Sequence, residues 1–585
     1  MLTINCAIPM LQLRLGVASL AAPFLALLAL LGAATGLWSF ERGSAKDARL
    51  IAIFAATMVL VLCAQSVAMF WLAWEAMSVV SAVLVASHHE RRGVRRATLT
   101  YVAVSQGGAL CILSALLMLA SYAGSPSFAT IAGARLPDGI RDAAFALAVI
   151  GFGSKAGFVP LHFWLPRAHP VAPANASAML SGIMLKVAVY GLVVFCLDLA
   201  GPPRLLWGIV ILTLGAISAI VGVLYAIVDH DLKRLLAYHS VENIGIIGIG
   251  LGLAIIAIAL NVPSVAAVAL IAALFHSINH GLFKGLLFLG AGTIADTEGT
   301  VDLEKLGGLW SRLAWSGPSF LIGCASISAL PPFNGFMSEW ITFQALIAAL
   351  SAASPLMICL AVTTIAALAL TSGLAVACFA KVFGVVFLGA PRRTDSPALI
   401  ERFGPASAAL GILALSCTIL GIVPSLALVQ LARLVATKVG TPLSLPSAPS
   451  LSIVLIIVPL LGAVASYVLA RYRRPRTVGT WTCGSPVTPS AQYSATAFSK
   501  PVRTIFAFFL APERRRTIDE GASLWFPRRI LYVTSSRYLV DELARHFAAR
   551  TLSLARRSRG LQSGSLRLYL LYAAVALVVT MVFAR

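Results

Sequence analysis

The stretch that decides the fold is "GFGSKAGFVPLHFWLPRAHP", which runs from Gly151 to Pro170. It overlaps an apolar run, Ala143 to Phe152, that suits the hydrocarbon core of a lipid bilayer. Lys155 therefore lies inside a candidate membrane crossing. Because a charged side chain near the bilayer centre costs about 2.5–3.5 kcal/mol on insertion scales, other groups must offset that cost.

The composition of the whole chain is that of an integral membrane protein. Of its 585 residues, 59% are hydrophobic and 11% are charged, and the mean hydropathy is +0.91. A soluble domain has about 25% charged residues. Since each crossing needs about 20 apolar residues, we expect an all-α membrane fold. The first apolar run, Val17 to Trp38, has no convincing cleavage site and is expected to remain as a helix.

The net charge of +22 is carried mainly by short loops and a C-terminal tail. This distribution favours positive-inside topology and contact with anionic lipid headgroups over nucleic-acid binding. The nine cysteines are scattered singly, with no Cys-x-x-Cys pair, so no iron–sulfur, haem or other cofactor is expected in this chain. The glycines of "GIIGIGLG" (Gly245 to Gly252) lie in an apolar helix and are not expected to form a dinucleotide-binding loop.

Fourteen apolar segments are candidate crossings. They are 16–38, 50–64, 66–87, 99–122, 143–164, 177–199, 205–228, 237–260, 264–294, 313–352, 355–389, 404–432, 451–470 and 566–584. The strongest basic loop, His88 to Arg96, is placed in the cytoplasm. Alternation then predicts that the loops at Arg167, Asp229–Arg234 and Asp296–Lys305 are cytoplasmic and that Gly201–Arg204 is not.

The segment that contains Pro331–Pro332 decides the number of crossings. Two helices there would put the basic groups Arg392–Arg393 and Arg471–Arg476 on the wrong side, whereas one interrupted helix puts both in the cytoplasm. We therefore expect one broken crossing and about fourteen crossings in total. Broken backbone at membrane depth is tolerated only where protein or a water-filled cavity covers it, so the break indicates a functional site.

Ionisable residues within the apolar segments form the candidate site, a proton relay. They are Glu75, Lys155, Lys186 and Glu339, together with His276, His280 and Lys284, whose i, i+4, i+8 spacing stacks them on one helix stripe. Buried groups of this kind change protonation readily, and chains of them mark proton pathways in membranes.

Less specific explanations exist for each of these residues. Glu75 and Lys155 could form a static ion pair, Lys186 could extend to the interface, and the two histidines could be core residues or zinc ligands. Four polar residues near a helix end are expected to be solvated groups that set topology: Lys233, Arg234, His239 and Glu242. Lys381, near the cytoplasmic end of its segment, is left unassigned.

Several motifs resemble the antiporter-like subunits of respiratory complex I, Mrp-type cation/proton antiporters and membrane-bound hydrogenases. They are "FWLAWEAMS" (70–78), "GSKAGFVPLHFWLPRAHPVAPANASAMLSGIMLKVAVYG" (153–191), "DLKRLLAYHSVENIG" (231–245), "HSINHGLFKGLLFL" (276–289) and "LPPFNGFMSEW" (330–340). The resemblance covers about residues 50–432. Together with the tail motifs "TWTCG" (480–484) and "QYSATAFSKPVRTIF" (492–506), these motifs are most similar to the hydrogenase-4 component B and formate hydrogenlyase group.

This resemblance implies fourteen core helices with two inverted five-helix repeats, each containing a discontinuous helix. The breaks would fall at Val159–Pro160 and Pro331–Pro332. The resemblance assigns Glu75 and Lys155 to the first half-channel and Lys186 to its centre. It assigns the helix of His276, His280 and Lys284 to the connection and Glu339 to the end of the second half-channel. Two of the four helices that precede the Glu75 helix in the family are expected to be missing.

The expected organisation has six parts. An N-terminal helix (1–49) precedes the two parts of the antiporter-like core (50–200 and 201–432), an extra helix (433–470), a basic cytoplasmic segment (471–565) and a last helix (566–585). An amphipathic helix is expected near Leu539–Arg557.

The resemblance implies a non-redox, proton-translocating membrane subunit of an oxidoreductase complex in the inner cell membrane. Its expected partners are other membrane subunits, peripheral iron–sulfur or hydrogenase-like subunits, and lipids. Two alternatives are an Mrp-like Na⁺/H⁺ antiporter subunit and a membrane anchor that does not pump. A lysine at the central site favours protons over sodium, because sodium prefers carboxylate and carbonyl oxygens.

Overall fold

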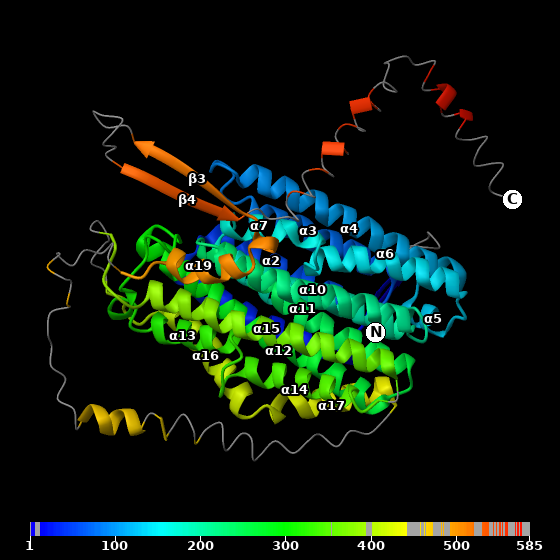
Figure 1. Cartoon of the computed structure of the whole chain (residues 1–585). Coiled ribbons are helices and arrows are strands. Elements are labelled where there is room, and N and C mark those ends of the chain that lie inside the picture. The colour runs from blue at the N-terminus through cyan, green and yellow to red at the C-terminus, as the bar shows by residue number, and fades with distance from the viewer. Residues whose placement is uncertain are drawn as a thin grey trace. The chain divides into compact units, whose positions relative to one another are not determined.

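The computed structural model describes residues 2–5, 12–352, 354–393, 400–440, 492–519 and 529–536, with scattered positions in 457–484 and 542–575. The chain divides into two compact units, residues 1–505 and 506–585. Figure 1 shows the long helices of the first unit lying side by side in a bundle.

The helices of the first unit are α1 (Ala22–Arg42), α2 (Ala45–Leu62), α3 (Val67–Val85), α4 (Val94–Ala123), α5 (Phe128–Gly133), α6 (Asp138–Ala156), α7 (Leu165–Val171), α8 (Ala174–Met179), α9 (Leu185–Val194), α10 (Leu205–Val228), α11 (Leu232–Ala259), α12 (Pro263–Glu298), α13 (Ser316–Ile327), α14 (Asn334–Ala349), α15 (Pro355–Val386), α16 (Pro405–Ile422), α17 (Ser425–Val439) and α19 (Ala495–Ile505).

The chain is a multi-pass membrane protein. Ten helices or helix runs in its described part are long and apolar enough to cross a membrane: Ser19–Arg42, α3, α4, Asp138–Val171, Ala174–Leu199, α10, α11, α12, α15 and α16. Helix α2 and the α13–α14 pair occupy two further predicted segments. Of the last two, half of 451–470 and most of 566–584 lie outside the described residues. The total of fourteen and the inverted repeats stay predictions.

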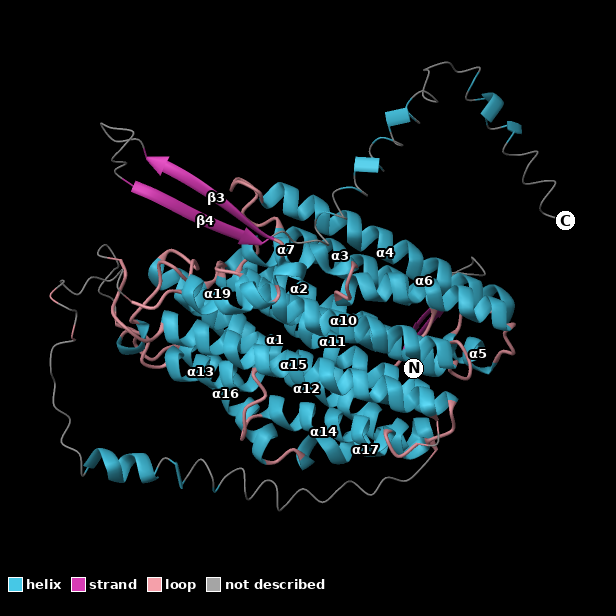
Figure 2. Ribbon diagram, in the orientation of Figure 1, coloured by secondary structure: helices cyan, strands magenta, loops and turns pink. Residues whose placement is uncertain are grey.

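Two strand pairs depart from the all-α expectation (Figure 2). Near the N-terminus, β1 (Leu2–Asn5) pairs antiparallel with β2 (Gln12–Leu15). In the second unit, short helix α20 (Ala507–Leu510) precedes β3 (Pro512–Asp519), which pairs antiparallel with β4 (Arg529–Ser536). The amphipathic helix expected at 539–557 lies largely outside the described residues. The basic segment also contains helices α19 and α20, which the sequence patterns did not predict.

Both expected helix interruptions are present, and a third accompanies them. The run that starts with α6 is interrupted at Val159–Pro160, and α13 is separated from α14 around Pro331–Pro332. Within the predicted crossing 404–432, α16 ends and α17 begins around Pro424, which cannot continue a regular helix. A Cβ atom on Gly421 would lie 2.1 Å from Pro332 O, so the second and third interruptions are in contact.

Glycines allow α10 and α11 to pack with their backbones in close contact. A Cβ atom on Gly245 would lie 2.4 Å from the backbone nitrogen of Ala219, and one on Gly252 would lie 2.4 Å from that of Leu212. Small residues at helix interfaces permit such close packing in membranes. The prediction that these glycines belong to an apolar helix and not to a dinucleotide-binding loop is confirmed, since both lie within α11.

Short contacts show which loops share an end of the bundle. The "inner end" is the end that holds residues 229–231 and 299–308, where Leu232 N–H donates to Val301 O over 3.0 Å. Lys233 Nζ donates to Ala172 O over 3.1 Å at the same end. At the opposite, outer end, Arg204 pairs with Asp138 at 2.9 Å. This grouping agrees with the predicted alternation of loops.

Substitution of Gly245 by alanine should destabilise the bundle, because the added methyl group would meet the α10 backbone. We expect Gly245→Ala to lower the free energy of unfolding by about 1–3 kcal/mol, measured as a lower thermal unfolding midpoint in detergent. Gly32 is the matched control, because nothing lies within 4 Å of its Cβ position in α1. An unchanged midpoint for Gly245→Ala would contradict the close packing.

Single-cysteine labelling should establish which end faces the cytoplasm. In a cysteine-free background, we expect Arg92→Cys and Lys500→Cys to react with an impermeant thiol reagent from the cytoplasmic side. Arg135→Cys, in the loop between α5 and α6, should react from the other side. Reaction of Arg92→Cys and Lys500→Cys from opposite sides would overturn the crossing order.

Candidate functional site

Lys155 lies in the last turn of α6 and is almost completely buried. Its ammonium donates to three hydroxyl groups, Ser78 Oγ at 2.9 Å, Tyr101 Oη at 2.9 Å and Ser105 Oγ at 2.7 Å. The same Nζ lies 5.0 Å from the centroid of the Tyr101 ring and 5.9 Å from that of Trp74, which adds cation–π attraction. Neutral groups from α3 and α4 therefore hold this charge.

Glu75 forms no ion pair with Lys155 in the described structure. Its Oε2 accepts from Gln106 Nε2 at 2.9 Å, and its buried Oε1 has no hydrogen-bond partner. The alternative of a static Glu75–Lys155 ion pair is therefore not observed in the described structure. Ser78, which is one turn after Glu75 on the same face of α3, contacts Lys155 instead.

Protein side chains satisfy the backbone groups freed by the break after Lys155. Trp164 Nε1 donates to Ser154 O at 2.7 Å, and the Val159 N–H donates to Ser218 Oγ at 2.9 Å. Satisfaction by neighbouring helices is what allows broken backbone at membrane depth.

Lys186 is completely buried at the start of α9. The preceding segment, Leu180–Met184, is π-helical, a form often found at functional sites. Lys186 Nζ donates to Ser181 O over 2.6 Å. The Ser181 hydroxyl lies 2.7 Å from Ser240 Oγ of α11. This contact links the central lysine to the next helix.

Lys284 of α12 is also completely buried and reaches the same part of α11. Its Nζ donates to Leu236 O over 2.5 Å, and Ser240 Oγ donates to the same carbonyl over 3.1 Å. The structure therefore joins Lys186 and Lys284 through Ser181, Ser240 and Leu236. No acidic side chain forms an ion pair with either lysine in the described structure.

The two predicted histidines extend this arrangement along α12. His276 Nδ1 lies 2.9 Å from Ser338 Oγ of α14, and its Nε2 lies 3.2 Å from Asn243 Oδ1 of α11. The ring of His280 is 6.4 Å from that of His276, and both of its ring nitrogens are buried without a partner. In the described part of the chain, no group of three or more His, Cys, Asp or Glu residues could hold a metal ion.

Glu339 completes the series in α14, directly after Ser338. Its Oε2 accepts from Ser372 Oγ of α15 at 2.6 Å, and the side chain is almost fully buried. The structure therefore brings Lys186, Lys284, His276 and Glu339 into one polar region. It leaves the Lys155 cluster apart, with a 3.7 Å contact from Tyr101 Oη to Met184 Sδ next to the π-helical segment.

His239 and Glu242 were wrongly expected to be solvated residues at a helix end. Helix α11 begins at Leu232, five residues before the predicted crossing, so both lie within the core and are almost completely buried. His239 Nδ1 contacts Glu242 Oε2, and His239 Nε2 has no partner. The run "YHSVEN" places several polar side chains inside an apolar helix, and this pattern could have indicated that His239 and Glu242 are buried.

His169 of α7 is a further buried residue that the candidate list omitted. Both of its ring nitrogens are buried without a partner. Its ring stacks on Phe288 with centroids 4.7 Å apart, and Lys284 Nζ lies 5.8 Å from the centroid of the same phenylalanine. His169 thus approaches the polar region from the side of α7.

Comparison with known proteins gives a consistent assignment. The family model "NADH:quinone oxidoreductase/Mrp antiporter, TM" matches residues 64–368, which include every candidate relay residue from Glu75 to Glu339. Hydrogenase-4 component B of Escherichia coli is 37% identical over 574 residues, covering 92% of this chain and 83% of that protein. Formate hydrogenlyase subunit 3 of the same organism is 39% identical over 363 residues, covering 62% and 60% respectively.

A solved structure supports the same fold. A chain of the membrane-bound sulfane sulfur reductase, an archaeal respiratory membrane complex, superposes with a TM-score of 0.77 at 25% identity. The alignment covers 99% of this chain and 91% of that one. The resemblance inferred from the motifs is confirmed. The chain belongs to the NADH:quinone oxidoreductase/Mrp antiporter transmembrane family.

Proposed function

We propose that the chain is the proton-translocating membrane subunit of a respiratory-type oxidoreductase complex and couples electron transfer in partner subunits to proton movement. The observation that supports this proposal is a pair of completely buried lysines, Lys186 and Lys284, whose carbonyl partners at Ser181 and Leu236 are connected through the hydroxyl groups of Ser181 and Ser240. Intramembrane chains of ionisable groups are costly to bury and are typical of proton pathways.

The lysines are suited to give up and regain a proton. Each is bound by neutral oxygen atoms, which stabilise the ammonium less than a carboxylate would. Burial disfavours the charged form, and a second positive charge nearby disfavours it further. A proton that arrives at one lysine therefore promotes release from the next, and His276 and Glu339 continue the path across α12 and α14.

The link to electron transfer would come from partner subunits. Related proteins named as hydrogenase-4 and formate hydrogenlyase subunits support assembly with other membrane subunits. Peripheral iron–sulfur or hydrogenase-like partners, the absence of a cofactor from this chain and an inner-membrane location are parts of the same proposal. A charge movement near Glu75 would reach Lys155 through Gln106, Ser78 and Ser105, on α3 and α4.

Replacement of Lys186 tests this function. In vesicles that contain the assembled complex, Lys186→Ala should lower proton translocation per electron transferred by about 100-fold or more, the scale of losing a proton-transfer group. Lys186→Arg should fail nearly as badly, because a guanidinium group does not deprotonate in proteins. The measurement is quenching of a pH indicator, normalised to the electron-transfer rate.

The control for this substitution is Lys438→Ala. Lys438 pairs with Asp198 at the outer end and should be dispensable for translocation. Full translocation with arginine at position 186 would contradict the proposal, because it would assign the lysine a structural role that needs only a positive charge.

A further inference from the structure

Lys381 is a fourth completely buried lysine, in α15 close to the inner end. Its Nζ donates to Ile227 O over 2.7 Å and to Asp229 O over 2.9 Å. These carbonyls lie at the C-terminal end of α10, where helical carbonyls lack intrahelical partners and the helix dipole is negative. Lys381 therefore has the same kind of neutral oxygen partners as Lys186 and Lys284, although no relay role has been assigned to it.

The His239–Glu242 pair of α11 packs against the part of α15 that carries Lys381. The His239 ring is 4.6 Å from the ring of Phe379, which is two residues before Lys381 in α15. Both Lys284 and Lys381 act electrostatically on His239. The unpartnered Nε2 of His239 can accept a proton, while its Nδ1 already contacts Glu242.

Cys378 lies near several of these buried titratable groups. This free, buried thiol is one turn from Lys381 on α15. It is within electrostatic reach of Lys381, Glu242, Lys284 and Asp229. Buried titratable groups of α11, α12 and α15, together with Asp229 just after α10, therefore lie near this thiol.

Helix α19 covers this region at the inner end. It turns Ala495, Ser499 and Arg503 inward, with i, i+4, i+8 spacing, and all three are buried. The Thr496 N–H and hydroxyl both donate to Glu304 Oε1 over 2.7 Å, and Thr496 Oγ1 lies 2.9 Å from His230 Nε2.

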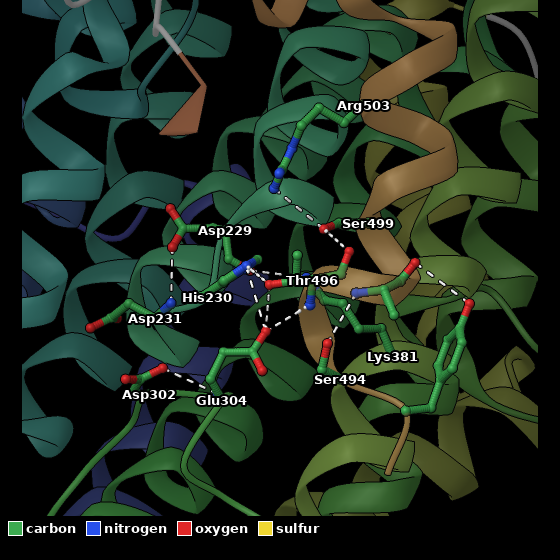
Figure 3. A network of polar contacts seen from close by, with 12 residues as sticks. Asp229, His230, Asp231, Asp302, Glu304, Lys381, Ser494, Thr496, Ser499 and Arg503 are labelled. Carbon is green, nitrogen blue, oxygen red and sulfur yellow. Dashed lines mark hydrogen bonds and ion pairs between the residues drawn. The ribbon is translucent and has the colours of Figure 1, made fainter. Parts of the chain in front are cut away.

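Figure 3 shows Thr496, Ser499 and Arg503 on α19, Ser494 directly before it, and Asp229, His230 and Glu304 on the core. The segment before α19 is also attached to the core. Gln492 exchanges hydrogen bonds with the backbone of Ala390, and Arg392 donates to Tyr493 O over 3.0 Å. Among the charged side chains near Lys381, Asp229 and Glu304 belong to the core and Arg503 belongs to α19, so α19 contributes a positive charge to this region.

A simpler explanation is that Lys381 only caps α10. Basic side chains often bind the last carbonyls of a helix. A static cap, however, does not require a neighbouring His–carboxylate pair or an unpartnered imidazole nitrogen in the core. It also does not explain why four buried titratable side chains lie near Cys378.

We propose that Lys381, His239 and Glu242 form an inner-side proton port that loads Lys284, and that α19 closes this port. The inference rests on the proposed function, since it adds an entry to the same relay. A proton taken up by the Lys381 amine passes to His239 Nε2 while His239 Nδ1 releases one to Glu242. The Glu242 carboxyl group then protonates the Lys284 amine, so one proton moves at each step and no electron is transferred.

Substitution of Lys381 distinguishes a proton-transfer role from a static helix cap. In the reconstituted complex, both Lys381→Arg and Lys381→Met should lower translocated protons per electron by about 100-fold or more, with unchanged assembly and electron transfer. Lys233→Met is the matched control, because Lys233 also binds a carbonyl at the inner end, and it should translocate normally. Glu242→Gln should reproduce the loss.

Full translocation by Lys381→Arg would overturn the port. If Lys186→Ala still abolished translocation in that case, the proposed function would stand without the port. A wild-type complex that translocates no protons would instead remove both proposals.

The reactivity of Cys378 tests the cover. Ser499→Trp places a bulky side chain on the buried face of α19 and should displace the helix from the core. We expect a hydrophilic thiol reagent added from the inner side to modify Cys378 several times faster in this variant, measured by mass spectrometry of its peptide. Lys500→Trp, on the exposed face, should leave the rate unchanged. Equal rates in both variants and the wild type would contradict closure by α19.

Discussion

The structure depends on how a bundle of apolar helices accommodates buried lysines without opposing carboxylates. Lys155 is bound by three hydroxyl groups, and Lys186, Lys284 and Lys381 by backbone carbonyls. A direct ion pair would favour the charged lysine strongly and hold its proton, whereas neutral oxygens allow either protonation state. The same arrangement therefore lowers the cost of burial and leaves the proton free to move.

Irregular helices help to place those oxygen atoms. The π-helical segment Leu180–Met184 supplies the Ser181 carbonyl to Lys186, and the end of α10 supplies carbonyls to Lys381. The glycine contacts between α10 and α11 bring the polar residues of α11 close to both neighbouring helices. Side-chain donors and acceptors satisfy the break after Lys155. The π-helical segment, the end of α10 and the break after Lys155 thus position the polar groups within the packed bundle.

The sequence predicted features that have a strong local signal. Prolines and charges inside apolar runs indicated both helix interruptions and the buried positions of Lys155 and Lys186. Predictions that needed three-dimensional contacts were less successful. Side-chain direction on α3 places Ser78 instead of Glu75 against Lys155. The start of α11 was placed too late, so His239 and Glu242 were assigned to solvent, and α19 lacked a continuous apolar run to identify it.

In the proposed function, Lys186 and Lys284 act in series on one path. The direct measurement is proton translocation per electron for Lys186→Ala, Lys284→Ala and the double variant, each in the assembled complex. A single path predicts that either substitution alone lowers translocation to the same residual level as the double variant, since groups that act as a unit are not additive. The contrary result is that each single variant retains about half of the translocation and only the double variant loses it, as independent sites would.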